Sequence, residues 1–152
     1  MGTICHPLSK EVICEQIASL LNTYNDLSYT RTFPDIMNGK VDYLVETHGK
    51  EVIAVCGHEA LNYQMVEIKH LVVHPSWRTK GLGSFMVGKC LNQVKAPLVY
   101  ATAKSNNRGS IKIFESLGFK ISCTYFNSTH EVTMLVRSNP KWIQKPNWKS
   151  VS

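Results

Sequence analysis

The sequence has no pair of cysteines separated by two residues, although five cysteines are spread along its 152 residues. Structural zinc sites are usually built on such closely spaced pairs, so we expect no metal site. The odd number and wide spacing of the cysteines also argue against a disulfide framework. Most of the thiols are therefore expected to lie in the core as small apolar side chains.

The sequence also lacks a long apolar run and a targeting segment. No run reaches the roughly 18 residues that a membrane span requires, and residues 1–10 contain no basic region followed by an apolar stretch. We therefore expect a cytoplasmic protein without a membrane partner.

The net charge of +6 favours an anionic partner, either a phosphate-rich cofactor or a nucleic acid.

The spacing of apolar residues predicts one α/β domain over residues 1–137, in which helices pack on a mixed sheet. Ser9 is expected to cap the first helix, and Gly118 to end the last one. Residues 138–152 form a basic tail that contains Trp142 and Trp148. The expected helices span residues 9–23, 81–92 and 107–117, residues 25–40 form a loop with at most one short helix, and the expected strands span residues 41–47, 52–56, 65–73, 97–101, 119–126 and 131–137.

A glycine-rich turn at residues 78–84, Arg-Thr-Lys-Gly-Leu-Gly-Ser, follows a predicted strand and opens a predicted helix. Glycine adopts positive φ easily and lets the backbone approach an anion closely. The first N–H groups of a helix have no intrahelical acceptor, so these groups and the helix dipole favour a pyrophosphate at this turn. Taken alone, the turn could equally be a plain connection, since the sequence contains neither the Rossmann fingerprint nor a P-loop.

Two segments carry a family resemblance. Residues 67–84, Glu-Ile-Lys-His-Leu-Val-Val-His-Pro-Ser-Trp-Arg-Thr-Lys-Gly-Leu-Gly-Ser, resemble the central motif of the GNAT superfamily of acyl-CoA-dependent N-acyltransferases, a strand ending in Leu-x-Val, a turn and then Arg/Gln-x-x-Gly-x-Gly/Ala. Residues 107–119, Asn-Arg-Gly-Ser-Ile-Lys-Ile-Phe-Glu-Ser-Leu-Gly-Phe, resemble the later motif, Asn-x-x-Ala-x-x-x-Tyr-x-x-x-Gly-Phe. The resemblance covers residues 41–137. It implies a mostly antiparallel mixed sheet, flanked by helices, whose central strands splay apart around the cofactor.

The resemblance implies acetyl-CoA as the acyl donor and assigns roles to the matching residues. The pyrophosphate would bind Arg78 and the N–H groups of residues 79–84, and the pantetheine arm would pair with the backbone of residues 71–73. Asn107 would contact the pantetheine region, cap the following helix, or do both. The residues expected to bind the cofactor are Leu71, Val72, Val73, Arg78, Thr79, Lys80, Gly81, Leu82, Gly83, Ser84, Asn107 and Phe114.

Glu67 is the expected general base. An amine that attacks a thioester must lose a proton, and Glu67 matches the base glutamate of the histone-acetylating members of the family. A solvated Glu67 paired with Lys69 is the alternative interpretation of this residue. Glu59, His58 and His70 are the alternative bases.

Strand alternation predicts how the side chains of this central strand are distributed. It places Glu67, Lys69, Leu71 and Val73 on one face and His70 on the other, unless a bulge intervenes. The backbone amide of Val72 or Val73 could then polarise the thioester carbonyl as an oxyanion donor.

The usual acid of the family is missing from the later motif. The tyrosine that would protonate the leaving thiolate is replaced by Phe114. Tyr125 is the candidate we retain for this role, and Tyr100, Cys123, Ser110 and water are alternatives. Acid catalysis typically raises the reaction rate about 10² to 10⁴-fold. The missing tyrosine therefore lowers the expected rate of transfer but does not change the expected cofactor.

These observations predict an N-acetyltransferase that passes an acetyl group directly from acetyl-CoA to a primary amine in a ternary complex. The acceptor amine, on a small molecule, peptide or protein, is not predicted, and a homodimer is compatible with the resemblance. Phe114 leaves open a catalytically weak, acyl-CoA-binding regulatory module. The alternation of lysine and tryptophan over residues 141–149 leaves open a nucleic-acid-binding protein, although we favour packing of these tryptophans on the domain or on a second subunit.

Overall fold

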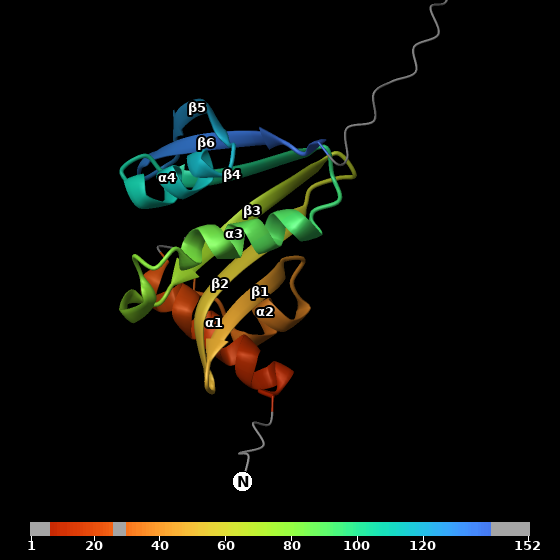
Figure 1. Cartoon of the computed structure of the whole chain (residues 1–152), viewed down its shortest axis with the longest axis vertical. Helices are drawn as coiled ribbons and strands as arrows, with labels where there is room; N and C mark the ends of the chain where they lie inside the picture. The colour runs from red at the N-terminus through yellow and green to blue at the C-terminus, as the bar shows by residue number, and fades with distance from the viewer. Residues whose placement is uncertain (1–6, 26–29, 141–152) are drawn as a thin grey trace, which may run out of the picture.

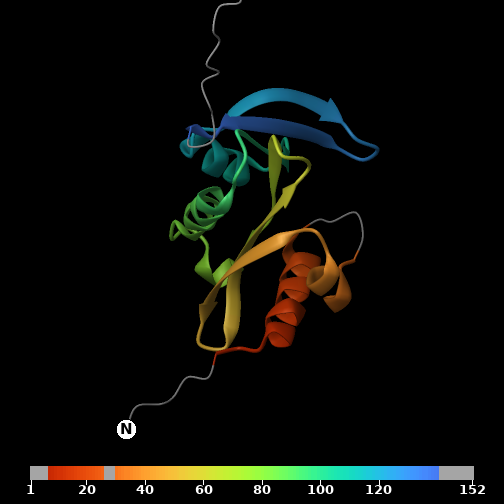
Figure 2. The same ribbon diagram turned by 90° about the vertical axis from the view of Figure 1, so that its right-hand side faces the viewer.

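Six strands form one mixed sheet in the order β1-β2-β3-β4-β6-β5, with helices on both faces (Figure 1, Figure 2). The computed structural model describes residues 7–25 and 30–140. Of the neighbouring strands, β3 and β4 run parallel and the other pairs are antiparallel, which confirms the expected fold class. The elements are α1 (Lys10–Tyr24), α2 (Phe33–Asn38), β1 (Asp42–His48), β2 (Glu51–Ala60), β3 (Met65–Val73), a 3₁₀ turn (Pro75–Trp77), α3 (Leu82–Gln93), β4 (Leu98–Lys104), α4 (Arg108–Ser116), β5 (Lys120–Phe126) and β6 (Glu131–Ser138).

The first helix starts where its capping residue predicts. The Ser9 side chain accepts a hydrogen bond from the Val12 N–H at 3.3 Å, which satisfies one of the unpaired donors of the first turn. The helix then buries an apolar stripe that includes Ile17 and Leu21. The predicted N-cap and the predicted helix are both confirmed.

Each face of the sheet carries its own apolar cluster. One cluster lies under α3 and α4 and includes Val66 and Ile68 of β3 together with Met86, Val87 and Cys90 of α3. The other lies under α1 and α2 and includes Leu21, Ile36, Val52, Val55 and Val72. Of the cysteines in the described residues, Cys14, Cys56 and Cys90 are buried and Cys123 is exposed, which matches the expectation that most thiols belong to the core.

Several strands extend beyond their predicted ends: β1 by one residue, β2 by four, β4 by three and β6 by one. The β2 strand continues to Ala60, because residues 57–60 still pair with β3 and because His58 still pairs with β1. The β6 strand runs to Ser138, and Asn139 beyond it is 4% exposed, with its N–H donating to the Pro97 carbonyl at 2.8 Å. The domain therefore continues past residue 137. The predicted tail from residue 141 onward lies outside the described residues.

The central strands splay apart, as the resemblance implies. The parallel ladder between β3 and β4 joins Met65–Ile68 to Leu98–Ala101 and stops there. Beyond this point β3 continues to Val73 and β4 continues to Lys104 without pairing to each other. The backbone at the end of β3 therefore borders an opening instead of a neighbouring strand.

A β-bulge in β3 lies at the start of this splay. The register with β2 passes from Gly57 opposite Lys69 to Val55 opposite Val72, so two residues of β3 face one residue of β2. The first of them, His70, has a φ of 57°.

The bulge reverses the alternation of side chains, so one prediction was wrong. Leu71 and Val73 pack against the cluster under α3, the same side as Ile68, whereas Val72 joins the cluster under α1. Leu71 and Val73 therefore do not share a face with Glu67. The extra residue shifts everything after it by one position, and a strand with a period of two residues then presents the opposite set of side chains.

Candidate active site

A cavity of about 670 Å³ opens at the splay, between the end of β3, the start of α3 and the start of α4. Most of the residues predicted to bind the cofactor line it, although they come from three separate segments of the chain. These residues are Leu71, Val72, Val73, Arg78, Thr79, Gly81, Leu82, Gly83, Ser84 and Asn107. The fold thus brings together the end of the central strand and both motif helices at one opening.

The glycine-rich turn enters α3 through a left-handed residue. Gly81 is the N-cap of α3 with φ 77°, a conformation that glycine adopts without the steric penalty of a Cβ. Thr79 also has a positive φ of 65°, which is an outlier for a β-branched residue. Strained backbone of this kind clusters at ligand-binding sites, where surrounding contacts hold it in place.

Arg78 is held at the rim of the cavity by the end of β3. Its Nε donates to the Val73 carbonyl at 3.0 Å, and its guanidinium carbon lies 5.9 Å from the centre of the Tyr24 ring. These contacts position a cation beside the free N–H groups of the first turn of α3. Together they form an electropositive end of the cavity suited to a phosphate group.

Lys80 and Phe114 do not line the cavity. The Lys80 ammonium lies 5.1 Å from the centre of the Trp77 ring. Phe114 is 4% exposed, and its ring meets that of Phe119 edge-on with centroids 5.1 Å apart. The predicted contact between Phe114 and the cofactor does not fit this core position. Tyr125, the retained acid candidate, is exposed on β5 and does not line the cavity either.

Several lining residues were missed by the sequence analysis. Gly109 and Ile113 belong to α4 and lie four positions apart on one face of this helix, a spacing that could have linked them once either was placed at the site. Tyr24 and Asn25 come from the end of α1, far away in the sequence, and no local motif marks them. Ser110, which was an alternative acid, lines the cavity as well.

Asn107 caps α4 at the edge of the cavity. Its Oδ1 accepts a hydrogen bond from the Ser110 N–H at 3.2 Å, so the predicted capping role is confirmed. Because Asn107 also lines the cavity, its amide NH₂ group is available at the place where the resemblance puts the pantetheine arm.

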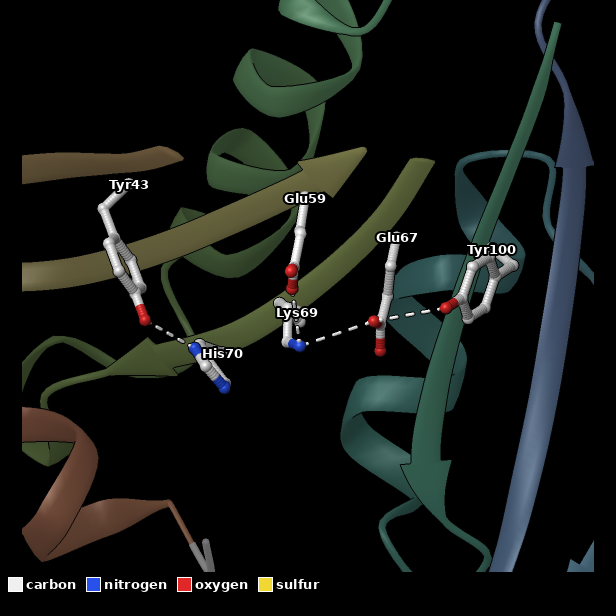
Figure 3. A network of polar contacts seen from close by, with 6 residues as sticks. All are labelled: Tyr43, Glu59, Glu67, Lys69, His70 and Tyr100. Atoms are coloured by element: carbon white, nitrogen blue, oxygen red, sulfur yellow. Dashed lines mark hydrogen bonds and ion pairs between the residues drawn. The ribbon is translucent and has the colours of Figure 1, made fainter. Parts of the chain in front are cut away.

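A row of polar side chains crosses the sheet beside the splay (Figure 3). The Lys69 ammonium lies 3.1 Å from Glu59 Oε2 and 3.4 Å from Glu67 Oε2. The Tyr100 hydroxyl donates to the same Glu67 oxygen at 3.2 Å. Burial, followed by the nearby Glu67 carboxylate, raises the pKa of Tyr100 to about 12, so its phenol keeps the proton it donates. The pairing of Glu67 with Lys69, weighed as an alternative to a catalytic role, is present.

His70 lies in the same row as Glu67, not on the opposite face as alternation predicts (Figure 3). The bulge and the left-handed backbone at His70 account for the change. The His70 Nδ1 lies 2.7 Å from the Tyr43 hydroxyl, and the two rings stack with an interplanar angle of 13°. Burial lowers the pKa of His70 to about 4, with the cations Lys69 and Arg31 adding to the effect.

The sequence matches a family model over most of this structure. The model of the acetyltransferase (GNAT) family matches residues 10–119, from α1 to the end of the second motif. The chain belongs to the GNAT acetyltransferase family. No curated protein shows a significant sequence match to it.

Solved structures of GNAT acetyltransferases share the fold. A putative acetyltransferase, yncA from Salmonella typhimurium with acetyl-CoA, superimposes with a TM-score of 0.74 at 17% identity, covering 88% of this chain and 92% of that chain. The aminoglycoside 6'-N-acetyltransferase from Enterococcus faecium gives 0.73 at 16% identity, covering 93% and 97%. Arabidopsis thaliana NAA60 with a bisubstrate analogue gives 0.71 at 14% identity, covering 88% and 95%. At these identities the similarity concerns the fold and not the acceptor.

The residues of this GNAT domain fit a CoA thioester. The volume of the cavity is typical of small-molecule sites. One end of the cavity suits the phosphate groups of CoA, and the other suits its pantetheine arm. The turn at Gly81 presents helix N–H groups beside Arg78. The end of β3, which pairs with β2 but not with β4, presents backbone groups for an amide-containing arm. Within the described residues, no three His, Cys, Asp or Glu side chains gather as a metal site, and no helix is long and apolar enough to span a membrane.

Proposed function

We propose that this protein transfers the acetyl group of acetyl-CoA directly to a primary amine. The observation that carries the proposal is the cavity at the splay between β3 and β4, which joins the end of β3, free of β4 on this side, to the N-terminus of α3. The membership in the GNAT family supports the same activity. The acceptor, the homodimer and the cytoplasmic location stay predictions.

The donor would lie along the cavity with its two ends held differently. The pyrophosphate would accept hydrogen bonds from the N–H groups of residues 79–84 and would face the Arg78 guanidinium. The pantetheine amides would pair with the backbone of residues 71–73, which is free of β4 at this level. The Asn107 amide would complete the contacts to this arm.

The acyl transfer then needs a proton acceptor and an oxyanion donor. When bound, acetyl-CoA supplies the thioester whose carbonyl carbon the amine attacks. Glu67 accepts a proton from the attacking nitrogen, and the backbone amide of Val72 or Val73 stabilises the negative charge on the carbonyl oxygen. The Tyr100 and Lys69 contacts to Glu67 Oε2 hold the carboxylate in place and leave Oε1 for the amine.

The leaving thiolate needs a proton that Phe114 cannot supply. Ser110 lines the cavity, whereas Tyr125 does not. We therefore propose Ser110, or water beside it, ahead of Tyr125 as the proton source. A CoA thiolate is a tolerable leaving group, so the absence of a strong acid is compatible with turnover.

Calorimetric titration with acetyl-CoA, CoA and ATP tests the proposal directly. We expect acetyl-CoA and CoA to bind with micromolar affinity and ATP to bind more weakly, because ATP lacks the pantetheine arm. Release of the CoA thiol in the presence of primary amines would then establish transfer. Failure of acetyl-CoA to bind the folded protein would contradict the proposed function.

Replacing Asn107 separates its two roles. Asn107→Ala should lower the stability by about 1 kcal/mol, the typical cost of losing an N-cap, and should also weaken acetyl-CoA binding. Asn107→Asp keeps an oxygen for the Ser110 N–H but loses the amide donor. We expect the aspartate variant to retain its stability in urea unfolding and to lose affinity in calorimetry. Normal acetyl-CoA affinity in both variants would mean that Asn107 caps α4 and does not contact the cofactor.

A further inference from the structure

His70 occupies a position that the proposed reaction can use. It follows Lys69 in the polar row and precedes Leu71, the first residue of β3 that lines the cavity. We propose that His70 is a second proton acceptor in the acyl transfer, acting on the acceptor nitrogen alongside Glu67. This inference rests on the proposed function and names a catalytic residue that the family motifs do not include.

The backbone at His70 is the first argument. A φ of 57° is uncommon for a residue with a Cβ, and it occurs here inside a strand, at a bulge. An unstrained strand would direct this side chain to the opposite face, into the cluster under α3. The bulge instead directs the imidazole toward the face that carries Glu67 (Figure 3). Strain held at such a place is typical of a catalytic constellation.

The ring of His70 is fixed by one partner. The Tyr43 hydroxyl contacts Nδ1 at 2.7 Å, and the tyrosine ring stacks on the imidazole with a centroid distance of 5.8 Å. Figure 3 shows the second ring nitrogen on the side away from Tyr43. The role assigned to His70 places the ring proton on Nδ1, which donates to the Tyr43 oxygen, so that Nε2 is unprotonated and can accept a proton from a substrate.

The surroundings of His70 keep it uncharged at neutral pH. Burial is the main cause of its pKa of about 4, the cations Lys69 and Arg31 contribute in the same direction, and Glu59 opposes them. The imidazole is therefore uncharged, with one ring nitrogen free of a proton, throughout the neutral range.

The attacking nitrogen loses protons in two separate steps, so two proton acceptors can take part in the reaction. An alkylammonium and a thioester give an amide, a thiol and one free proton, so the nitrogen loses two protons in all. One is lost before the N–C bond forms, and one is lost after it, as the C–S bond breaks and the sulfur leaves with its electron pair. We assign the first proton to His70, which passes it to water, and the second to Glu67. A proton from Ser110 or water ends on the sulfur, and the proton on Glu67 returns through water to that donor, so the proton passed on by His70 is the one released.

Chemical rescue of His70→Gly tests the assignment. Glycine accepts the left-handed backbone, so the bulge is retained, and the missing ring leaves space for free imidazole. The probes are acetyl-CoA with ethanolamine, 1,4-diaminobutane or the dipeptide Ala-Ala, whichever the unmodified protein acetylates fastest. We expect unchanged acetyl-CoA affinity, a fall in thiol release of about 100-fold, and recovery of at least a tenth of the activity on addition of imidazole.

Two variants and one control reaction make the result specific. Tyr43→Phe keeps the stacking ring but loses the hydroxyl, so its turnover should fall without any response to imidazole. His130→Gln changes a histidine whose Nε2 contacts Asn127 between β5 and β6 instead, and its turnover should be unchanged. Imidazole should not accelerate the unmodified protein.

The outcomes separate this inference from the proposed function. Full turnover in His70→Gly, or a loss that imidazole does not restore, would overturn the role of His70 while acetyl transfer stands. Absence of acetyl-CoA binding in the unmodified protein would overturn the proposed function, and this inference with it.

Discussion

Replacing Gly81 with valine should abolish measurable acetyl-CoA binding while the domain stays folded. Gly81 has φ 77° and caps α3, so the N–H groups of the first turn depend on its left-handed conformation. A left-handed conformation costs a residue with a Cβ about 1–2 kcal/mol, and a β-branched side chain is at the upper end. We expect the turn to rearrange and the affinity to fall by about 100-fold or more, which corresponds to about 2.7 kcal/mol.

The packing around Gly81 indicates that the loss would come from the backbone. A Cβ at this position would meet nothing within 4 Å, so the substitution does not disturb the core. Gly83 differs, because a Cβ there would lie 2.8 Å from Cδ1 of Ile113 in α4. A valine at Gly83 would therefore disturb the packing of two helices as well as the cavity. Gly81 is the cleaner test.

Gly88 offers a matched control within the same helix. It lies away from the cavity, and a Cβ there also meets nothing within 4 Å. Gly88→Ala should leave the acetyl-CoA affinity unchanged and raise the stability by about 0.5–1 kcal/mol, since alanine favours a helix interior. Calorimetry and urea unfolding measure the two quantities. Unchanged affinity in a folded Gly81→Val variant would remove the pyrophosphate assignment.

Changing Glu67 to glutamine should lower turnover by about 100-fold, within the usual range for a general base. Glutamine has the same shape, and its side-chain oxygen can still accept the hydrogen bond from the Tyr100 hydroxyl. It cannot take up a proton. Because Glu67 does not line the cavity, the acetyl-CoA affinity should stay within about twofold. Thiol release at saturating acetyl-CoA, together with calorimetry, measures both effects.

Glu59 provides the control for Glu67. Both carboxylates contact the Lys69 ammonium, so Glu59→Gln removes the same kind of charge from the same cluster. We expect this variant to keep its turnover within a few-fold. Equal losses of turnover in the two variants would mean that each substitution lowers turnover through its contact with Lys69. Full turnover in Glu67→Gln would mean that the base is elsewhere or that the amine needs none.

Short-range patterns predicted much of the fold. The strand Met65–Val73 was predicted with both of its ends, and Ser9 and Asn107 cap helices as their residue types indicate. These features depend on contacts within a few residues of each other, such as a side-chain oxygen and an N–H three positions later. The turn at residues 78–84 belongs to the same class, because its glycines and its place between a strand and a helix are visible locally.

The bulge could not be predicted in the same way. His70 is not a glycine or an asparagine, so nothing in its identity indicates a positive φ. The bulge is defined by the register of β3 against β2, and these strands are paired through long-range contacts. As a result, the faces of His70, Leu71 and Val73 were predicted incorrectly, although the strand itself was correct. Phe114 is a similar case, because its motif position suggests a cofactor contact whereas its ring packs on Phe119 in the core.

The sequence by itself therefore determined the family, the order of the elements and the segments that meet at the cavity. Each of these follows from residue types at fixed spacings along the chain. The tertiary structure decided which side chains share the site. It brought Tyr24 from α1 to the rim, turned His70 onto the face of the sheet that carries Glu67, and placed Tyr125 outside the cavity. The physical reason is that register, bulges and helix docking depend on the packing of distant segments, which no local spacing encodes.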